Sequence, residues 1–122
     1  MNVLLVALGG AVGAAVRYLL DEFAKAQLGS DFPWGIFIVN VSGSLLIGVV
    51  VGLISNEILP DWAQPLVVVG VLGGYTTFST YSQDNLQLLM AGNPGAALLN
   101  ALGQVILGIV AVYLGLLLTR GL

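Results

Sequence analysis

The pattern of hydrophobic and polar positions divides the chain into four long apolar stretches. They run from about Val3 to Leu20, Trp34 to Ile54, Pro65 to Met90 and Gly95 to Leu118. A helix needs about 20 residues to cross the hydrocarbon core of a bilayer. Because a lipid-facing segment must satisfy its own backbone hydrogen bonds, each stretch is predicted to be a transmembrane helix.

Short polar segments separate these stretches. The first span is predicted to end near Leu20, where a connector begins that carries Asp21, Glu22 and Lys25. The last connection is a tight turn, Gly92-Asn93-Pro94. The N-terminal MNVLLVALGG lacks the basic residues of a secretory signal, so we interpret it as part of a retained first span.

The third span is unusual in its middle, which reads GGYTTFSTYSQD from Gly73 to Asp84. Five of the seven residues from Thr76 to Ser82 carry a Ser or Thr hydroxyl. Glycines, hydroxyls and aromatics at this depth predict a broken helix, which is tolerated where it is buried in protein or lines a wet cavity. The alternative is a continuous helix whose hydroxyls bond back to their own carbonyls.

The composition places most of the surface in lipid. The chain is 58% hydrophobic and 7% charged, whereas a soluble domain carries about 25% charged residues. The 122 residues leave room for one domain, covering 1–122. There is no cysteine for a disulfide or thiolate metal site and no histidine for general-base chemistry, so an enzyme is not expected. The net charge of −3 provides no basic footprint for a nucleic acid.

The distribution of basic residues predicts little preference between the two orientations in a membrane. Four spans place both termini on one side, together with Arg120, and Lys25 lies on the other side. A chain without such a preference can insert both ways and form an antiparallel homodimer. The alternative is that Arg17 or the N-terminal amine decides the orientation.

Pairs of glycines one turn apart predict close packing of the helices. Such pairs occur at Gly9 and Gly13, Gly48 and Gly52, and Gly70 and Gly74. They let helix backbones approach each other closely in lipid.

Polar residues inside the spans are candidates for a functional site. Arg17 can extend to the interface or provide a fixed positive charge near an anion entrance. Asn40 and Ser44 lie one turn apart in the second span, and Asn100 and Gln104 lie one turn apart in the fourth. Either pair alone fits a structural hydrogen bond between helices. Together with the hydroxyl-rich break they favour a polar conduit.

The residue types along this conduit favour an anion. They are mainly hydrogen-bond donors, and Asp84 is the one deep carboxylate, so no acidic ring indicates a cation pathway. Phe78 and Tyr81 are three residues apart and lie near one face of a helix. Their ring edges carry partial positive charge that can approach a small anion, although packing against lipid or protein is an alternative. These features alone predict a small dimeric anion pathway and do not select the anion.

Three motifs resemble the Fluc (CrcB) family of fluoride ion channels. They are GGAVGAAVRY from Gly9 to Tyr18, VNVSGSLLIG from Val39 to Gly48, and GGYTTFST from Gly73 to Thr80. The resemblance covers nearly the whole chain. It implies an all-α membrane protein with a broken third span, assembled as an antiparallel dual-topology dimer with two fluoride pores. It also implies passive export of cytoplasmic fluoride across a bacterial inner membrane.

The resemblance also implies roles for particular residues. The fluoride pathway would comprise Asn40, Phe78, Ser79, Thr80, Tyr81 and Gln104, with Arg17 at the vestibule and Asp84 near the break. A structural sodium ion at the dimer interface would be held by the backbone carbonyls of Gly73 and Thr76. Hard cations prefer such oxygen ligands.

The chain departs from the family pattern at four positions. Tyr81 stands where a second phenylalanine is usual, and its hydroxyl could donate to fluoride or change the rate. Asp84 stands where glutamate is common. Gln104 and Gly108 stand in the fourth span where hydroxyl side chains are expected. Gln104 can still donate a hydrogen bond, whereas Gly108 offers no side chain.

Two other functions fit a small four-span protein. A dual-topology multidrug exporter needs a membrane-embedded carboxylate, but the first span carries Arg17 instead and Asp84 lies in a different span. A non-conducting structural subunit would explain the glycine pairs but not the polar residues at depth.

Overall fold

Each apolar stretch of the sequence is helical in the computed structural model, which describes residues 2–122. The elements in chain order are α1 (Asn2–Leu28), α2 (Trp34–Ser55), the π-helix η1 (Gln64–Leu72), α3 (Gly73–Tyr75), α4 (Phe78–Met90) and α5 (Pro94–Thr119). Of these, α1, α2 and α5 are long and apolar enough to cross a membrane. The third predicted span is made of η1, α3 and α4 in succession.

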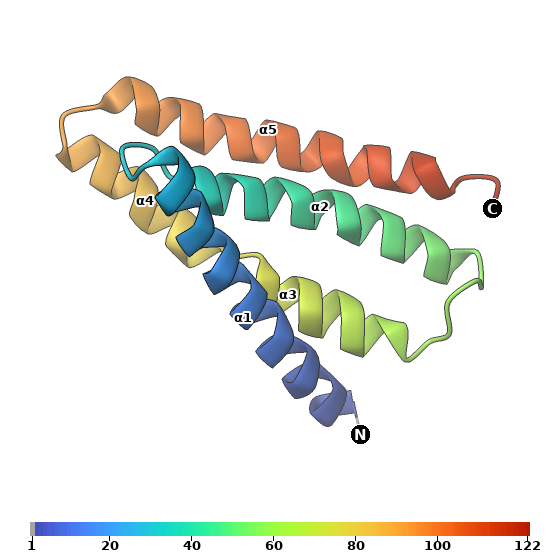
Figure 1. The fold of residues 1–122 in the computed structure, drawn as a ribbon. Helices are drawn as coiled ribbons and strands as arrows, with labels where there is room; N and C mark the ends of the chain where they lie inside the picture. Colours follow the sequence, from blue (N-terminus) through green and yellow to red (C-terminus); the bar gives the residue numbers. More distant parts are fainter. Residues whose placement is uncertain (1) are drawn as a thin grey trace.

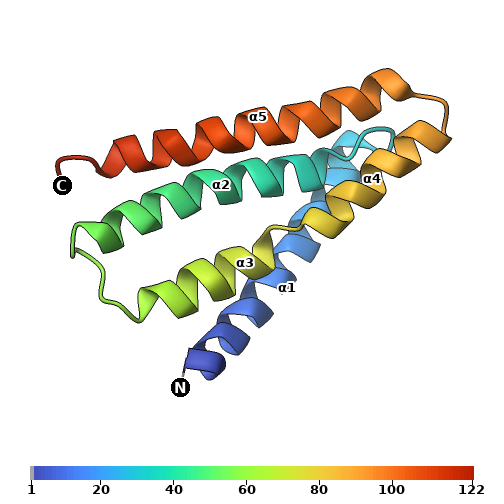
Figure 2. The same ribbon diagram turned by 180° about the vertical axis from the view of Figure 1, so that it is seen from behind.

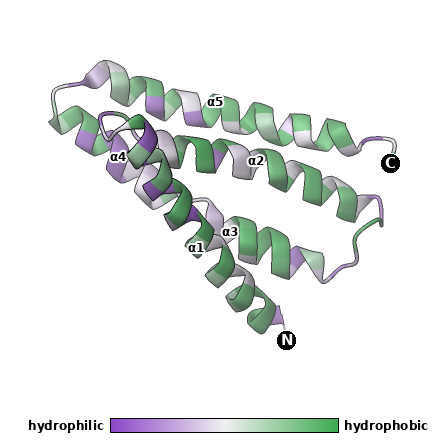
Figure 3. Ribbon diagram, in the orientation of Figure 1, coloured by the Kyte–Doolittle hydropathy of each residue, from purple (hydrophilic) through white to green (hydrophobic). Residues whose placement is uncertain are grey.

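The helices form an elongated bundle in which α5 lies beside α2, and α1 crosses the η1–α3 segment (Figures 1 and 2). Both termini lie toward the end of the bundle that holds the α2–η1 connection, as an even number of spans predicts (Figure 1). The residues of α1, α2 and α5 are largely hydrophobic, whereas α4 carries more hydrophilic residues (Figure 3). This pattern is that of a helical membrane protein in which one helical segment is polar.

The predicted break in the third span is confirmed. The helix stops after Tyr75, and Thr76 (φ −84°, ψ 158°) and Thr77 (φ −152°, ψ 122°) are extended before α4 begins. Thr77 is the N-cap of α4, because its hydroxyl oxygen accepts a hydrogen bond from Thr80 N at 3.2 Å. A threonine cap of this kind satisfies one of the backbone N–H groups that a new helix exposes, so the sequence restarts the helix locally.

The first span is longer than predicted. The sequence indicated a connector from Asp21 onward, but α1 continues to Leu28. Lys25 Nζ lies 3.1 Å from Asp21 Oδ2, an i,i+4 ion pair that stabilises a helix, and it also complements the helix dipole in the last turn. The helix ends at Gly29, whose φ of +84° is accessible to glycine at low cost.

The turn before the fourth span was predicted correctly. Gly92 adopts a φ of +77°, and Pro94 occupies the first turn of α5. The side chain of Asn93 accepts a hydrogen bond from Ala96 N at 3.2 Å and so caps α5.

The glycine pairs bring helix backbones into contact, as predicted. A Cβ atom placed on Gly70 would lie 2.9 Å from Gly9 Cα, and one placed on Gly74 would lie 2.7 Å from Gly10 O. The same close approach joins α2 to α5, where a Cβ on Gly115 would lie 2.9 Å from Gly48 Cα. The small residues thus pack α1 on the third span and α2 on α5 within one chain.

Candidate ion pathway

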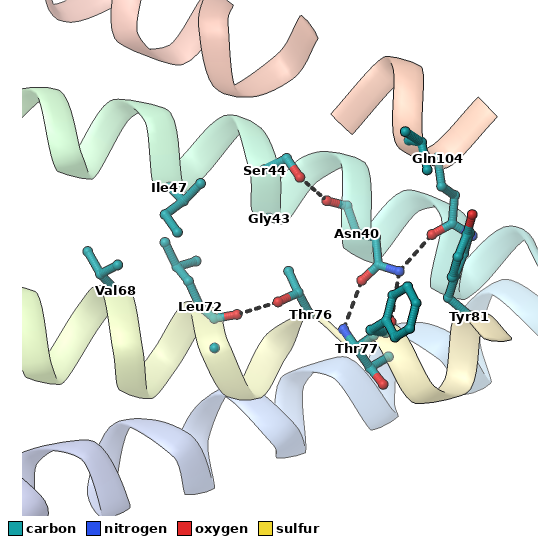
Figure 4. Close-up of a pocket in the computed structure, with 13 residues that line it drawn as sticks. Asn40, Gly43, Ser44, Ile47, Val68, Leu72, Thr76, Thr77, Tyr81 and Gln104 are labelled. Carbon is teal, nitrogen blue, oxygen red and sulfur yellow. Dashed lines mark hydrogen bonds between the residues drawn. The ribbon is translucent and has the colours of Figure 1, made fainter. Parts of the chain in front are cut away.

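A cavity of about 320 Å³ lies at the break in the third span (Figure 4). Its wall brings together residues from five helical segments, and six of them are site residues predicted from the sequence: Asn40, Gly73, Thr76, Phe78, Tyr81 and Gln104. Ser44 and Thr77 are further polar members of the wall. Hydroxyls, amides and ring edges therefore meet at one place, although they are separated by up to 64 residues along the chain.

Asn40 binds the backbone of Thr77, the second of the two extended residues at the break. Its Nδ2 donates to Thr77 O at 3.1 Å, and its Oδ1 accepts from Thr77 N at 2.9 Å. The amide thus pairs with both backbone polar groups of Thr77, as a neighbouring β-strand would (Figure 4). A backbone N–H or C=O left unpaired away from water costs about as much as a lost hydrogen bond, so Asn40 stabilises the interruption of the helix.

Both donor hydrogens of Asn40 are used within the chain. The second one goes to Gln104 Oε1 at 2.6 Å, which links α2 to α5. Gln104 Nε2 in turn donates to Asn100 Oδ1 at 2.9 Å. Asn40 and the predicted pair Asn100 and Gln104 are therefore parts of one side-chain network that ends on the break. Ser44 lies outside this network, because its Oγ donates to the backbone oxygen of Asn40 at 2.8 Å within α2.

The break also changes the partners of two backbone carbonyls. In an uninterrupted helix Gly73 O and Thr76 O would accept from Thr77 N and Thr80 N. These two N–H groups bind Asn40 Oδ1 and Thr77 Oγ1 instead. Gly73 and Thr76 both line the cavity. Their carbonyl oxygens thus lack their usual helical donors. Such oxygens are the type of ligand that the predicted sodium ion requires.

Arg17 is directed at the break. Its Nε donates to Gly74 O at 3.1 Å, and the side chain is partly buried. Gly74 lies in α3, at the C-terminal end of the first half of the broken span. A cation is stabilising at the C-terminal end of a helix, where carbonyl groups lack helical donors. Arg17 therefore caps this half of the span.

Phe78 and Tyr81 form a pair on one face of α4, as their spacing predicts. Their ring centroids are 5.6 Å apart with an interplanar angle of 38°. Phe78 is 78% exposed in the single chain. The Tyr81 hydroxyl donates to Ala101 O at 2.6 Å, so its hydrogen is used to join α4 to α5. In this arrangement the ring edge of Tyr81, and not its hydroxyl, is available to an ion.

The remaining candidates lie outside the cavity at the break. Ser79 is exposed. Thr80 and Asp84 line a second cavity of about 640 Å³, together with Asp21 and Lys25 at the end of α1. Asp84 Oδ2 is buried and has no hydrogen-bond partner among residues 2–122. The structure thus separates Asp84 from the break and places it beside the connector.

Two contacts were not predicted from the sequence. Asn85 accepts a hydrogen bond from Asn100 Nδ2 at 2.7 Å, which extends the amide network to α4. The signal in the sequence was an additional amide within a span. In addition, Ser44 Oγ lies 3.4 Å from the position that a Cβ on Gly108 would take, so a hydroxyl from α2 lies beside the glycine that lacks a polar side chain.

The arrangement defines a class of protein: a multi-pass helical membrane protein with a polar site at an interrupted span, as in channels and transporters. Residues 4–116 match the family model described as CrcB-like protein, Camphor Resistance (CrcB). The chain belongs to this family.

Several relatives are similar over most of their length. The chain is 46% identical over 121 residues to the fluoride-specific ion channel FluC of Magnetococcus marinus, covering 98% of each chain. It is 46% identical over 112 residues to the fluoride-specific ion channel FluC of Thermus thermophilus, covering 92% of this chain and 88% of the relative. It is 43% identical over 125 residues to the fluoride-specific ion channel FluC 2 of Nitrobacter hamburgensis, covering 100% of this chain and 99% of the relative.

Proposed function

We propose that this chain is a fluoride-selective passive channel of a bacterial inner membrane, which exports cytoplasmic fluoride and protects against its toxicity. The observation that carries this proposal is the 46% identity over 98% of the chain to a fluoride-specific ion channel. It is supported by a cavity at the broken span that is lined by polar and aromatic side chains. Fluoride enters cells as neutral HF from acid surroundings and ionises in the neutral cytoplasm, so an open pathway lets the trapped anion leave down its electrochemical gradient.

The functional unit that we propose is an antiparallel homodimer in which residues 1–122 form one channel domain per copy. The equal count of basic residues on the two sides supports insertion in both orientations. Phe78 is 78% exposed beside the cavity in one chain, so a second copy could complete the wall there. Large side chains of α2 and α5, among them Ile38, Leu46 and Val105, are also exposed.

The pathway is assigned to Asn40, Phe78, Ser79, Thr80, Tyr81 and Gln104. Asn40 holds Thr77 and shapes the wall, while the ring edges of Phe78 and Tyr81 offer partial positive charge. Gln104 Nε2 has a second hydrogen besides the one that it gives to Asn100. Fluoride is strongly hydrated, so replacement donors must be numerous and close. Arg17 adds a positive charge near the break, and Asp84 lies in the adjoining cavity.

Two carbonyl oxygens from each copy, Gly73 O and Thr76 O, would hold a structural sodium ion between the copies. The ion would neutralise the oxygens that the break exposes and join the two subunits. We expect purified protein dialysed from sodium into N-methylglucamine, a cation too large for such a site, to dissociate at least about 10-fold more readily, since a bound ligand stabilises the state that binds it. Single-molecule photobleaching in liposomes measures the dimer fraction as the protein is diluted in the membrane, and so tests whether dissociation increases without sodium. An unchanged dimer fraction would argue against the ion.

The ring edge of Tyr81 is expected to matter more than its hydroxyl. Tyr81→Phe removes the bond to Ala101 O, worth about 1 kcal/mol, but keeps the ring beside Phe78. Fluoride flux should therefore stay within about 3-fold of the original, whereas Tyr81→Leu, which has no ring edge, should lose about 10-fold, the equivalent of about 1.4 kcal/mol. Initial rates of fluoride release from liposomes measure both. Equal losses in the two variants would place the effect on the hydroxyl.

The proposed function is tested by ion release from liposomes that contain the purified protein. The vesicles are loaded with potassium fluoride, valinomycin provides the counter-current of potassium, and a fluoride electrode follows the anion. A matched set is loaded with potassium chloride. Rapid release of fluoride without chloride is expected. Release of neither ion from a folded protein would favour a non-conducting structural subunit, and drug-dependent proton exchange would favour a multidrug exporter.

A further inference from the structure

The amides around the break form a hydrogen-bonded chain with one direction. Thr77 N donates to Asn40, Asn40 donates to Gln104 at 2.6 Å, Gln104 donates to Asn100 at 2.9 Å, and Asn100 donates to Asn85 at 2.7 Å. Asn40, Gln104 and Asn100 each accept on their oxygen and donate from their nitrogen, and Asn85 accepts at the end of the series. The series connects the break with α2, α5 and α4.

The backbone of Thr77 determines this direction. A backbone N–H only donates and a carbonyl only accepts, so Asn40 must direct Oδ1 at Thr77 N and Nδ2 at Thr77 O. The other hydrogen of Asn40 Nδ2 then requires an oxygen from Gln104. This in turn orients the Gln104 nitrogen toward Asn100. A reversed amide anywhere in the series would bring two donors or two acceptors into contact.

Asn100 is the most enclosed member of the series. It has no exposed surface, and Gln104 is only 6% exposed. Water therefore has little access to replace a missing partner, and an unpaired amide in this place is costly. Asn100 does not line the cavity at the break, whereas Gln104 does.

We propose that Asn100 is a positioning residue for the ion pathway. It fixes the orientation of the Gln104 amide and, through that amide, the hydrogen bonds between Asn40 and the backbone of Thr77. This inference rests on the proposed function. By accepting from Gln104 Nε2, Asn100 keeps Gln104 Oε1 directed at Asn40 and one amide hydrogen of Gln104 available to the cavity. Asn85 completes the arrangement by accepting from Asn100.

A double-mutant cycle in liposomes tests whether Asn100 acts through Gln104. Asn100→Leu keeps the shape but removes both hydrogen bonds, and Gln104→Met keeps the length but removes the amide. Asn100→Leu is expected to reduce fluoride release about 10-fold in the original protein, and less than 2-fold in the Gln104→Met background. Equal reductions in both backgrounds, or no reduction in either, would overturn the proposal.

A second readout does not depend on conduction. Amide hydrogen exchange of the segment 73–81 reports directly on the pairing of Thr77 N with Asn40. Asn100→Leu should increase exchange in this segment and leave the segment 9–16 of α1 unchanged. If the original protein releases no fluoride but the exchange shows this pattern, the proposed function fails while the positioning role stands. Unchanged exchange in the segment 73–81 would contradict the positioning role.

A milder variant covers the case in which Asn100→Leu does not fold. Asn85 is partly exposed, and Asn85→Leu removes only the acceptor at the end of the series. It should reduce fluoride release about 3-fold in the original protein and have no effect in the Gln104→Met background. A loss of the same size in both backgrounds would count against the proposal.

Discussion

Replacement of Asn40 by aspartate is expected to reduce fluoride release by about 100-fold or more. The carboxylate keeps the acceptor for Thr77 N but directs an oxygen at Thr77 O and at Gln104 Oε1, which lies 2.6 Å from the present nitrogen. The two hydrogen bonds donated by Asn40 Nδ2 are lost, and oxygen atoms with like partial charge face each other. Each polar group left unpaired costs about 1–3 kcal/mol. A change of about 1.4 kcal/mol corresponds to a tenfold change in rate. The added negative charge also opposes an anion. Initial fluoride efflux from liposomes at matched protein density measures the effect.

Asn56 offers a matched control for this substitution. Its Nδ2 donates to Thr119 O at 2.8 Å, so Asn56→Asp also removes an amide-to-carbonyl bond between α2 and α5. Asn56 lies at the end of α2, outside the cavity at the break. Flux through Asn56→Asp should stay within about 2-fold of the original, as expected for a surface substitution. Undiminished flux in Asn40→Asp would refute the assigned role of Asn40.

Substitution of Gly13 by alanine is expected to be the most destabilising single-methyl change in the chain. A Cβ at this position would overlap Val71 O and lie 2.8 Å from Tyr75 N, both backbone atoms that cannot move without displacing η1 and α3. Overpacking of this kind costs about 1–3 kcal/mol, and more where the backbone must shift. Because η1 and α3 lead directly into the break, fluoride release should fall as well. Unfolding in mixed detergent micelles gives the change in free energy.

Gly10 provides the control on the same helix. The nearest atom to a Cβ on Gly10 is Gly70 O at 4.0 Å, an ordinary contact distance. Gly10→Ala adds the same methyl group at a position of α1 where it meets no close neighbour. Its effect on the free energy of unfolding should stay within about 0.5 kcal/mol. Similar losses at Gly10 and Gly13 would show that helix contact does not explain the sensitivity.

The spans and the break were predictable because their causes are local. The length of each apolar stretch determines the helices, and the run of glycine and hydroxyl residues from Gly73 to Ser82 indicates the interruption. Gly92 and Pro94 mark the turn before α5 for the same reason. The extension of α1 was missed because ion pairs of Lys25 with Asp21 and Glu22 stabilise a helix that hydropathy alone would end.

The partners of the polar residues were not predictable, since they depend on how distant helices meet. The sequence indicated that Asn40 and Gln104 were candidates. It did not indicate that these two residues, 64 positions apart, would form a hydrogen bond with each other. It left Arg17 between two roles, and only the contact with Gly74 O shows that it caps the broken span. The hydroxyl of Tyr81 was a candidate donor until its bond to Ala101 O was visible.

The central claim is that this protein conducts fluoride passively and selectively, and the reversal potential across a planar bilayer tests it most directly. Purified protein is incorporated with sodium fluoride on one side and an equal concentration of sodium chloride on the other, both at one pH. We expect a large current with a reversal potential far from zero, on the side set by the fluoride gradient, and no shift of this potential when a pH difference is added. A reversal potential near zero would show that the current has no preference for fluoride over chloride, and a shift with the pH difference would show coupling to protons. Either result would contradict passive, selective conduction of fluoride.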